Sequence, residues 1–118
     1  MSTPVQYLIE WSMKPDGQEK FKALGKAAID SVRSGEPGTT GYQWYFDASG
    51  EKCYLNESFD SSESLLTHLE NIGPVLPKFL EVSDITRFEV FGDLSADALA
   101  AVSGLQAVVH TNWDGFVR

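Results

Sequence analysis

The feature that most constrains the fold is an alternation of residue character, with a period of two, in four separate segments. Val5–Met13 is the first of them, and Thr40–Phe46, Glu51–Phe59 and Asp84–Phe91 follow. Such alternation is typical of β-strands, in which successive side chains point to opposite faces of a sheet. The turn residues between the second and third segments predict that those two strands form a hairpin.

Two helices are predicted between these strands. The first begins near Asp16, as a capping residue, and ends at Gly35, whereas the second begins at Asp60 or Ser61 and ends before Gly73. Residues 75–82 predict a short helical turn that is interrupted by a proline. The order is therefore β-α-β-β-α-β, the ferredoxin-like α+β pattern of an antiparallel sheet covered by two helices.

The end of the chain adds to this pattern. Residues 97–103 predict a third helix and residues 107–111 a fifth strand, while Trp113 and Phe116 are expected to anchor the tail. A length of 118 residues is typical of one domain. We therefore expect a single domain over residues 1–118, with a core at 5–92 and a C-terminal extension at 93–118.

Both faces of the predicted sheet carry large apolar groups. A sheet covered by helices on one side usually has a polar second face, yet Tyr7 opposes Leu8 and Trp44 opposes Tyr45. Burying one aromatic side chain is worth roughly 2–3 kcal/mol, so leaving several in water is unfavourable. Either the C-terminal extension or a second copy of the chain could cover this face, unless the rings lie flat on an exposed sheet. We favour a homodimer through the open face.

Composition excludes several functions. The chain is 42% hydrophobic and 22% charged, which is ordinary for a soluble globular protein, and no apolar run approaches the roughly 18 residues of a membrane span. A net charge of −8 argues against nucleic-acid and membrane surfaces as partners. The single cysteine, Cys53, favours a buried role and a reducing cytoplasm. No motif for a nucleotide, a metal or another cofactor is present.

Glu57 and His68 are candidates for acid–base chemistry. Glu57 lies in the apolar row of its strand beside Leu55, and a carboxylate among apolar neighbours has a raised pKa suited to proton transfer. The alternative is a salt bridge or a strand-end position that faces water. His68 flanks an apolar helical stripe, where it could transfer protons or be bonded to a neighbour as a half-buried helix residue. Spacing does not decide whether the two residues meet.

Four residues of the hairpin are predicted to form a wall for a ligand. If Trp44 pairs with Tyr54, then Tyr42 meets Asn56 on the same face. The three rings would make an aromatic wall, and the amide would orient a carbonyl or phenol. The alternative is dimer packing, with Asn56 bonded internally.

The segment from Glu57 to His68 resembles a motif of the antibiotic biosynthesis monooxygenase (ABM) family, namely Glu-x-aromatic followed by a helix with a histidine. Gly41-Tyr42-Gln43-Trp44-Tyr45 is similar to the glycine-led second strand of that family. The layout from Val5 to Phe91 is also similar. The resemblance implies a dimeric α+β barrel, in which the sheet of each ferredoxin-like protomer packs against a twofold mate and a pocket lies between sheet and helices.

Some members of this family oxygenate phenols or quinols without metal or flavin, because the substrate anion itself reacts with oxygen. Glu57 and His68 match the carboxylate and histidine of the family by position, whereas Phe59 stands where a tryptophan is common. The resemblance therefore implies a cofactor-independent monooxygenase, an oxidoreductase acting on a small aromatic such as a quinol or polyphenol. One alternative is a non-catalytic, small-molecule-binding or structural homodimer. Another is haem binding through His68, against which the absence of an asparagine in the first strand argues.

Overall fold

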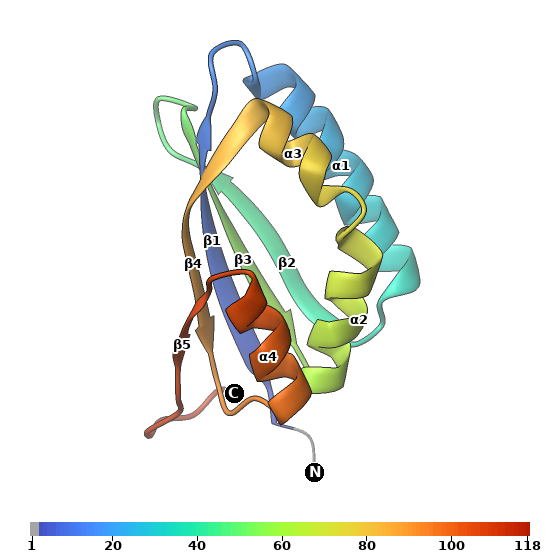
Figure 1. Cartoon of the computed structure of the whole chain (residues 1–118), viewed down its shortest axis with the longest axis vertical. Coiled ribbons are helices and arrows are strands. Elements are labelled where there is room, and N and C mark those ends of the chain that lie inside the picture. Colours follow the sequence, from blue (N-terminus) through green and yellow to red (C-terminus); the bar gives the residue numbers. More distant parts are fainter. Residues whose placement is uncertain (1–2) are drawn as a thin grey trace.

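The computed structural model describes residues 3–118 as a five-stranded sheet with its helices on one face (Figure 1). The strand order is β2-β3-β1-β4-β5, antiparallel except for the parallel pair β4 and β5. This arrangement confirms the predicted ferredoxin-like α+β fold. In chain order, the elements are β1 (Val5–Met13), α1 (Gln18–Gly35), β2 (Thr39–Phe46), β3 (Lys52–Phe59), α2 (Ser62–Ile72), α3 (Leu76–Val82), β4 (Ser83–Phe91), α4 (Ala96–Gly104) and β5 (Val108–His110).

The helix ends agree with the sequence in part. Ser61 caps α2 as predicted, because its side chain accepts a hydrogen bond from the backbone N–H of Ser64. Asp16 does not cap α1: it has a φ of 60°, and Gly17 holds the capping position without a side-chain hydrogen bond. The predicted interruption at Pro77 is also wrong. Pro77 lies in the first turn of α3, where a missing N–H costs no helical hydrogen bond.

The core lies between the inner face of the sheet and the helices. Alternate residues of β1 point inward, and Tyr7 and Ile9 pair with Glu57 and Leu55 of β3. The buried side chains Phe21 of α1, Leu65 of α2 and Phe79 of α3 cover this face. A carboxylate therefore lies in the middle of an otherwise apolar layer.

The predicted hairpin register is wrong by one residue. Trp44 pairs with Leu55 rather than with Tyr54. Tyr54 and Asn56 consequently point to the outer face of the sheet, opposite to Tyr42 and Trp44.

The turn sets this register. The backbone N–H of Asp47 donates to the carbonyl oxygen of Lys52 over 3.0 Å, and Gly50 between them has a φ of 74°. Aromatic residues occupy both faces of the hairpin strands, so apolar alternation alone does not distinguish one register from the next.

The C-terminal extension does not cover the outer face. Helix α4 packs beside α2 on the helix side of the sheet, and β5 continues the sheet at its β4 edge (Figure 1). Within one chain the outer face therefore keeps Tyr45 and Phe91 exposed, with Leu8 and Tyr54 partly exposed between them.

The prediction that Trp113 and Phe116 anchor the tail is wrong for the single chain. Trp113 is 95% exposed, and Phe116 is also exposed, because the chain leaves the sheet after β5. Within residues 3–118, no helix combines the length and the apolar character needed to cross a bilayer.

Candidate active site

His68, a buried residue of α2, is held between two carboxylates. His68 Nδ1 is 2.8 Å from Glu36 Oε1, and His68 Nε2 is 2.7 Å from Glu57 Oε1. Glu36, Glu57 and His68 are only 4%, 1% and 2% exposed. The three residues come from the link between α1 and β2, from β3 and from α2, so the fold brings together the two acid–base candidates and adds a second carboxylate.

Glu36 is fixed by further donors. Asn71 Nδ2 donates to Glu36 Oε2 over 2.6 Å, and Thr39 Oγ1 donates to Glu36 Oε1 over 2.7 Å. Its backbone N–H donates to Val32 at the end of α1. The position of His68 is therefore set by a residue that is itself held from several sides.

The protonation of the pair follows from burial and charge. Burial alone lowers the pKa of His68, but the contacts with Glu57 and then Glu36 outweigh it, so the pKa is raised. Burial raises the pKa of Glu57, and contacts with His68 and Tyr7 offset only part of that shift. A protonated imidazole ring has an N–H on each nitrogen, and each nitrogen of His68 faces a carboxylate oxygen within 2.8 Å. Glu57 is thus a stronger base than an exposed glutamate.

Two tyrosine hydroxyls lie beside this group. The rings of Tyr7 and Tyr42 are centred 6.1 and 5.5 Å from the ring of His68. Burial first, and the charge of Glu57 next, raise the pKa of both hydroxyls, which therefore stay protonated at neutral pH and act as donors. Although His68 is close, neither oxygen of Glu57 has a hydrogen bond of good geometry within residues 3–118. Glu57 retains the capacity to accept one.

A cavity of about 450 Å³ lies between the inner face of the sheet and the helices α2, α3 and α4. Glu57 and His68 form part of its wall, at positions almost closed to solvent, whereas the lining residues Leu80 and Leu105 are exposed. Most of the remaining wall is aromatic or aliphatic, including Trp44. Such an enclosure, with a few convergent polar groups, is typical of a small-molecule site.

The cavity includes some of the residues predicted from sequence and not others. Glu57, His68, Tyr42 and Trp44 line it. The other two residues of the predicted wall, Tyr54 and Asn56, do not, because the hairpin register places them on the outer face.

Haem does not fit this site. Both nitrogens of His68 face carboxylate oxygens within 2.8 Å, so the ring has no free nitrogen for an iron. Residues 3–118 also contain no group of three histidine, cysteine or acidic side chains arranged to hold a metal ion.

Sequence reasoning missed Glu36 and Tyr7. Glu36 stands in a Glu-Pro-Gly link that reads as an exposed loop, and nothing local signals its burial. Tyr7 belongs to an inward row with Ile9 and Trp11. Its only signal is the pairing with Glu57, which depends on the register of two strands distant in sequence.

Residues 4–81 match the model of the family described as antibiotic biosynthesis monooxygenase. The matched segment is about two thirds of the chain. The chain belongs to the antibiotic biosynthesis monooxygenase family. The matched segment contains Glu36, Glu57 and His68 and ends before α4.

Solved structures show the same fold. MupZ from Pseudomonas fluorescens is 21% identical, with a TM-score of 0.82 over 100% of this chain and 96% of its own. Rv0793 from Mycobacterium tuberculosis is 26% identical, with a TM-score of 0.66 over 78% of this chain and 96% of its own. A putative antibiotic biosynthesis monooxygenase from Chloroflexus aurantiacus is 14% identical, with a TM-score of 0.60 over 74% of this chain and 89% of its own. No curated protein matches the chain in sequence.

Proposed function

We propose that the protein is a cofactor-independent monooxygenase that oxidises a small phenolic or quinol-like aromatic in the cavity. One observation carries the proposal: Glu57, a buried base with unused acceptor capacity, shares the wall of an apolar cavity with Tyr42 and Trp44. Membership of the monooxygenase family supports it.

Glu57 is the base in this proposal. It takes the proton of a phenolic hydroxyl, while His68, held by Glu36, keeps the carboxylate in place. Tyr7 and Tyr42 remain protonated and donate hydrogen bonds to the phenolate oxygen that forms. The aromatic wall, with Trp44, stacks against the ring and keeps water away.

The phenolate then supplies the electrons. A ring carbon bearing hydrogen forms a bond to one atom of dioxygen, the O–O bond breaks, and the second oxygen leaves as water. A phenol plus O₂ thus gives a quinone plus H₂O, with the four electrons drawn from the substrate. The protein contributes deprotonation, orientation and stabilisation of the anion.

Oxygen uptake with a panel of phenols and hydroquinones tests this function. We expect turnover by the wild type and a loss of more than tenfold in Glu57→Gln and in His68→Ala, as for removal of an acid–base group. Glu63→Gln, which changes an exposed glutamate of α2, serves as the control and should retain the rate. His68→Gln provides a second variant should His68→Ala fail to fold.

Unchanged rates in both site variants would end the catalytic proposal. If the wild type binds phenols but consumes no oxygen with any compound of the panel, the result would instead favour a binding protein of the same fold.

We also propose that two copies pack through their outer sheet faces. The support is that Tyr45 and Phe91 stay exposed there, that Leu8 and Tyr54 lie between them, and that the extension packs elsewhere. Covering these groups with a second sheet would bury apolar surface that one chain leaves in water.

A further inference from the structure

Helix α2 carries two side chains that reach the same carboxylate. Asn71 lies three residues after His68, so both project from one side of the helix. Asn71 Nδ2 donates to Glu36 Oε2 over 2.6 Å, whereas His68 Nδ1 is 2.8 Å from Glu36 Oε1. Asn71 also donates to Ser31 Oγ over 3.2 Å and so ties the last turn of α2 to α1. Each oxygen of Glu36 is thus used by one residue of α2.

Glu36 lies behind the cavity wall and not in it. The described residues of that wall include Glu57 and His68 but neither Glu36 nor Asn71. Glu36 is 4% exposed, and its oxygens face His68, Asn71 and the hydroxyl of Thr39. Any effect of this carboxylate on the cavity therefore passes through His68.

The charges that face His68 come from two carboxylates. Among residues 3–118, the titratable groups next to its ring are Tyr7 of β1, Tyr42 of β2, Glu57 of β3 and Glu36. Burial, and then the charge of Glu57, raise the pKa of both tyrosines, which stay neutral. Burial lowers the pKa of His68, but the contacts with Glu57 and then Glu36 raise it above its ordinary value. Without Glu36, only one carboxylate would offset the cost of a buried cation.

A charge on His68 in turn acts on Glu57. His68 Nε2 is 2.7 Å from Glu57 Oε1. Burial raises the pKa of Glu57, and the contact with His68 lowers it again in part. A neutral His68 would remove this attraction between opposite charges, so Glu57 would keep its proton to a higher pH. Glu36 therefore controls, from behind the histidine, the pH range in which Glu57 is available as a base.

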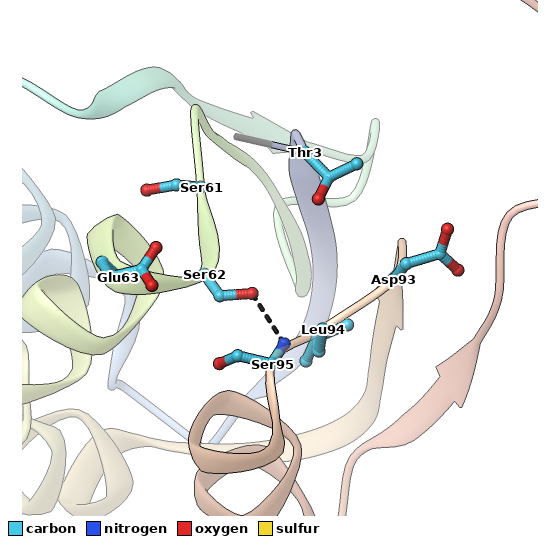
Figure 2. A pocket seen from close by; sticks show the side chains of 7 residues that line it. All are labelled: Thr3, Ser61, Ser62, Glu63, Asp93, Leu94 and Ser95. Carbon is cyan, nitrogen blue, oxygen red and sulfur yellow. Dashed lines mark hydrogen bonds between the residues drawn. The ribbon is translucent and has the colours of Figure 1, made fainter. Parts of the chain in front are cut away.

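The first turn of α2 is fixed independently of Glu36. Figure 2 shows the Ser62 side chain directed at the backbone nitrogen of Ser95, which donates to Ser62 Oγ over 3.0 Å. Ser61 caps the helix by accepting from the N–H of Ser64. Glu36→Gln keeps the shape of the side chain and an acceptor oxygen. It therefore changes the charge next to the histidine while these contacts hold the helix in place.

We propose that Glu36, fixed by Asn71, is a positioning residue for the reaction in the cavity: its negative charge holds a proton on His68 Nδ1 and thereby keeps a cation beside Glu57. The inference rests on the proposed function for the action of Glu57 as a base. The charge of His68 does not depend on turnover and is measured separately.

Nitrogen-15 NMR of the histidine rings against pH tests the charge. In Glu36→Gln, we expect the midpoint of the His68 titration to fall by about 1–3 pH units, the usual effect of losing an opposite charge at this distance, with Nδ1 unprotonated at pH 7. Asn71→Asp, at an exposed position, adds a carboxylate beside Glu36 and should raise the midpoint. Glu70→Gln removes an exposed carboxylate from the same helix and should leave the midpoint unchanged, because solvent screens that charge.

Oxygen uptake against pH, with a hydroquinone that the wild type consumes, tests the effect on Glu57. In Glu36→Gln, the rise of the rate with pH should move to higher pH, and the rate at high pH should approach that of the wild type. A purely structural role of Glu36 would instead lower the rate at every pH without moving the curve.

An unchanged His68 midpoint in Glu36→Gln would overturn the inference, and so would a midpoint that Asn71→Asp lowers or leaves unchanged, or a uniform loss of rate. Should Glu36→Gln fail to fold by circular dichroism, Asn71→Asp decides by the His68 midpoint. If the wild type consumes no oxygen, the monooxygenase proposal fails, and the NMR titrations alone decide whether Glu36 sets the charge of His68.

Discussion

Replacing Glu36 with alanine should lower the free energy of unfolding by about 3–5 kcal/mol, the usual effect of breaking a buried ion pair. Glu36 is 4% exposed and accepts from Asn71 and Thr39 besides facing His68. Its removal leaves three donors without their acceptor. Each hydrogen bond to a charged group contributes about 1.5–3 kcal/mol, and since the three share one carboxylate, they do not add fully.

Urea unfolding at pH 7, followed by circular dichroism, measures this change. Glu70→Ala is the control, because Glu70 is an exposed glutamate on α2 and its loss should change stability by no more than about 0.5 kcal/mol. Glu36→Gln keeps an acceptor oxygen and the shape of the side chain, so it should lose less than Glu36→Ala. A loss below about 1 kcal/mol in Glu36→Ala would show that the buried group does not hold α2 to the sheet, and our reasoning about its geometry would fail.

Three further outcomes follow from the structure. Because folding raises the pKa of His68 and of Glu57, each group stabilises the folded protein while it is protonated; this contribution is lost as pH rises above about 4.3 for Glu57 and above about 6.5 for His68, so urea unfolding from pH 4.5 to 9 should show a falling stability in the wild type, with a smaller fall above pH 6.5 in His68→Gln. Light scattering should give the wild type the mass of two chains and Tyr54→Lys a lower mass, and a wild-type monomer would contradict the outer-face proposal. Ser62→Ala should cost about 1–3 kcal/mol in a thermal or urea melt, because it leaves the Ser95 N–H at the start of α4 unpaired; no loss would mean that α4 is held otherwise.

The elements of the fold could be predicted because their signals are local. Alternation in Val5–Met13 reports a strand regardless of what it pairs with. Ser61 and Gly73 bound α2 through capping chemistry that needs only neighbouring residues. These features required no knowledge of distant parts of the chain.

The site depended on information that is not local. With rings on both faces of the hairpin, apolar pattern did not fix whether Tyr54 or Leu55 pairs with Trp44, and the turn decided it. The burial of Glu36 follows from where α1 ends relative to α2, which no short segment reveals. For the same reason, the sequence left open whether the extension covers the outer face or, as in the structure, adds α4 to the cavity wall.

The central claim is that His68 is held charged between Glu36 and Glu57 at the wall of a ligand cavity. Nitrogen-15 NMR of the histidine rings against pH, with and without 2-naphthol, tests it most directly, and the exposed His110 of β5 provides an internal control. We expect both ring nitrogens of His68 to carry protons at pH 7, its titration to lie above the ordinary pKa of about 6.5, and 2-naphthol to shift His68 but not His110. A His68 ring that is neutral at pH 7 and unmoved by 2-naphthol would contradict the account.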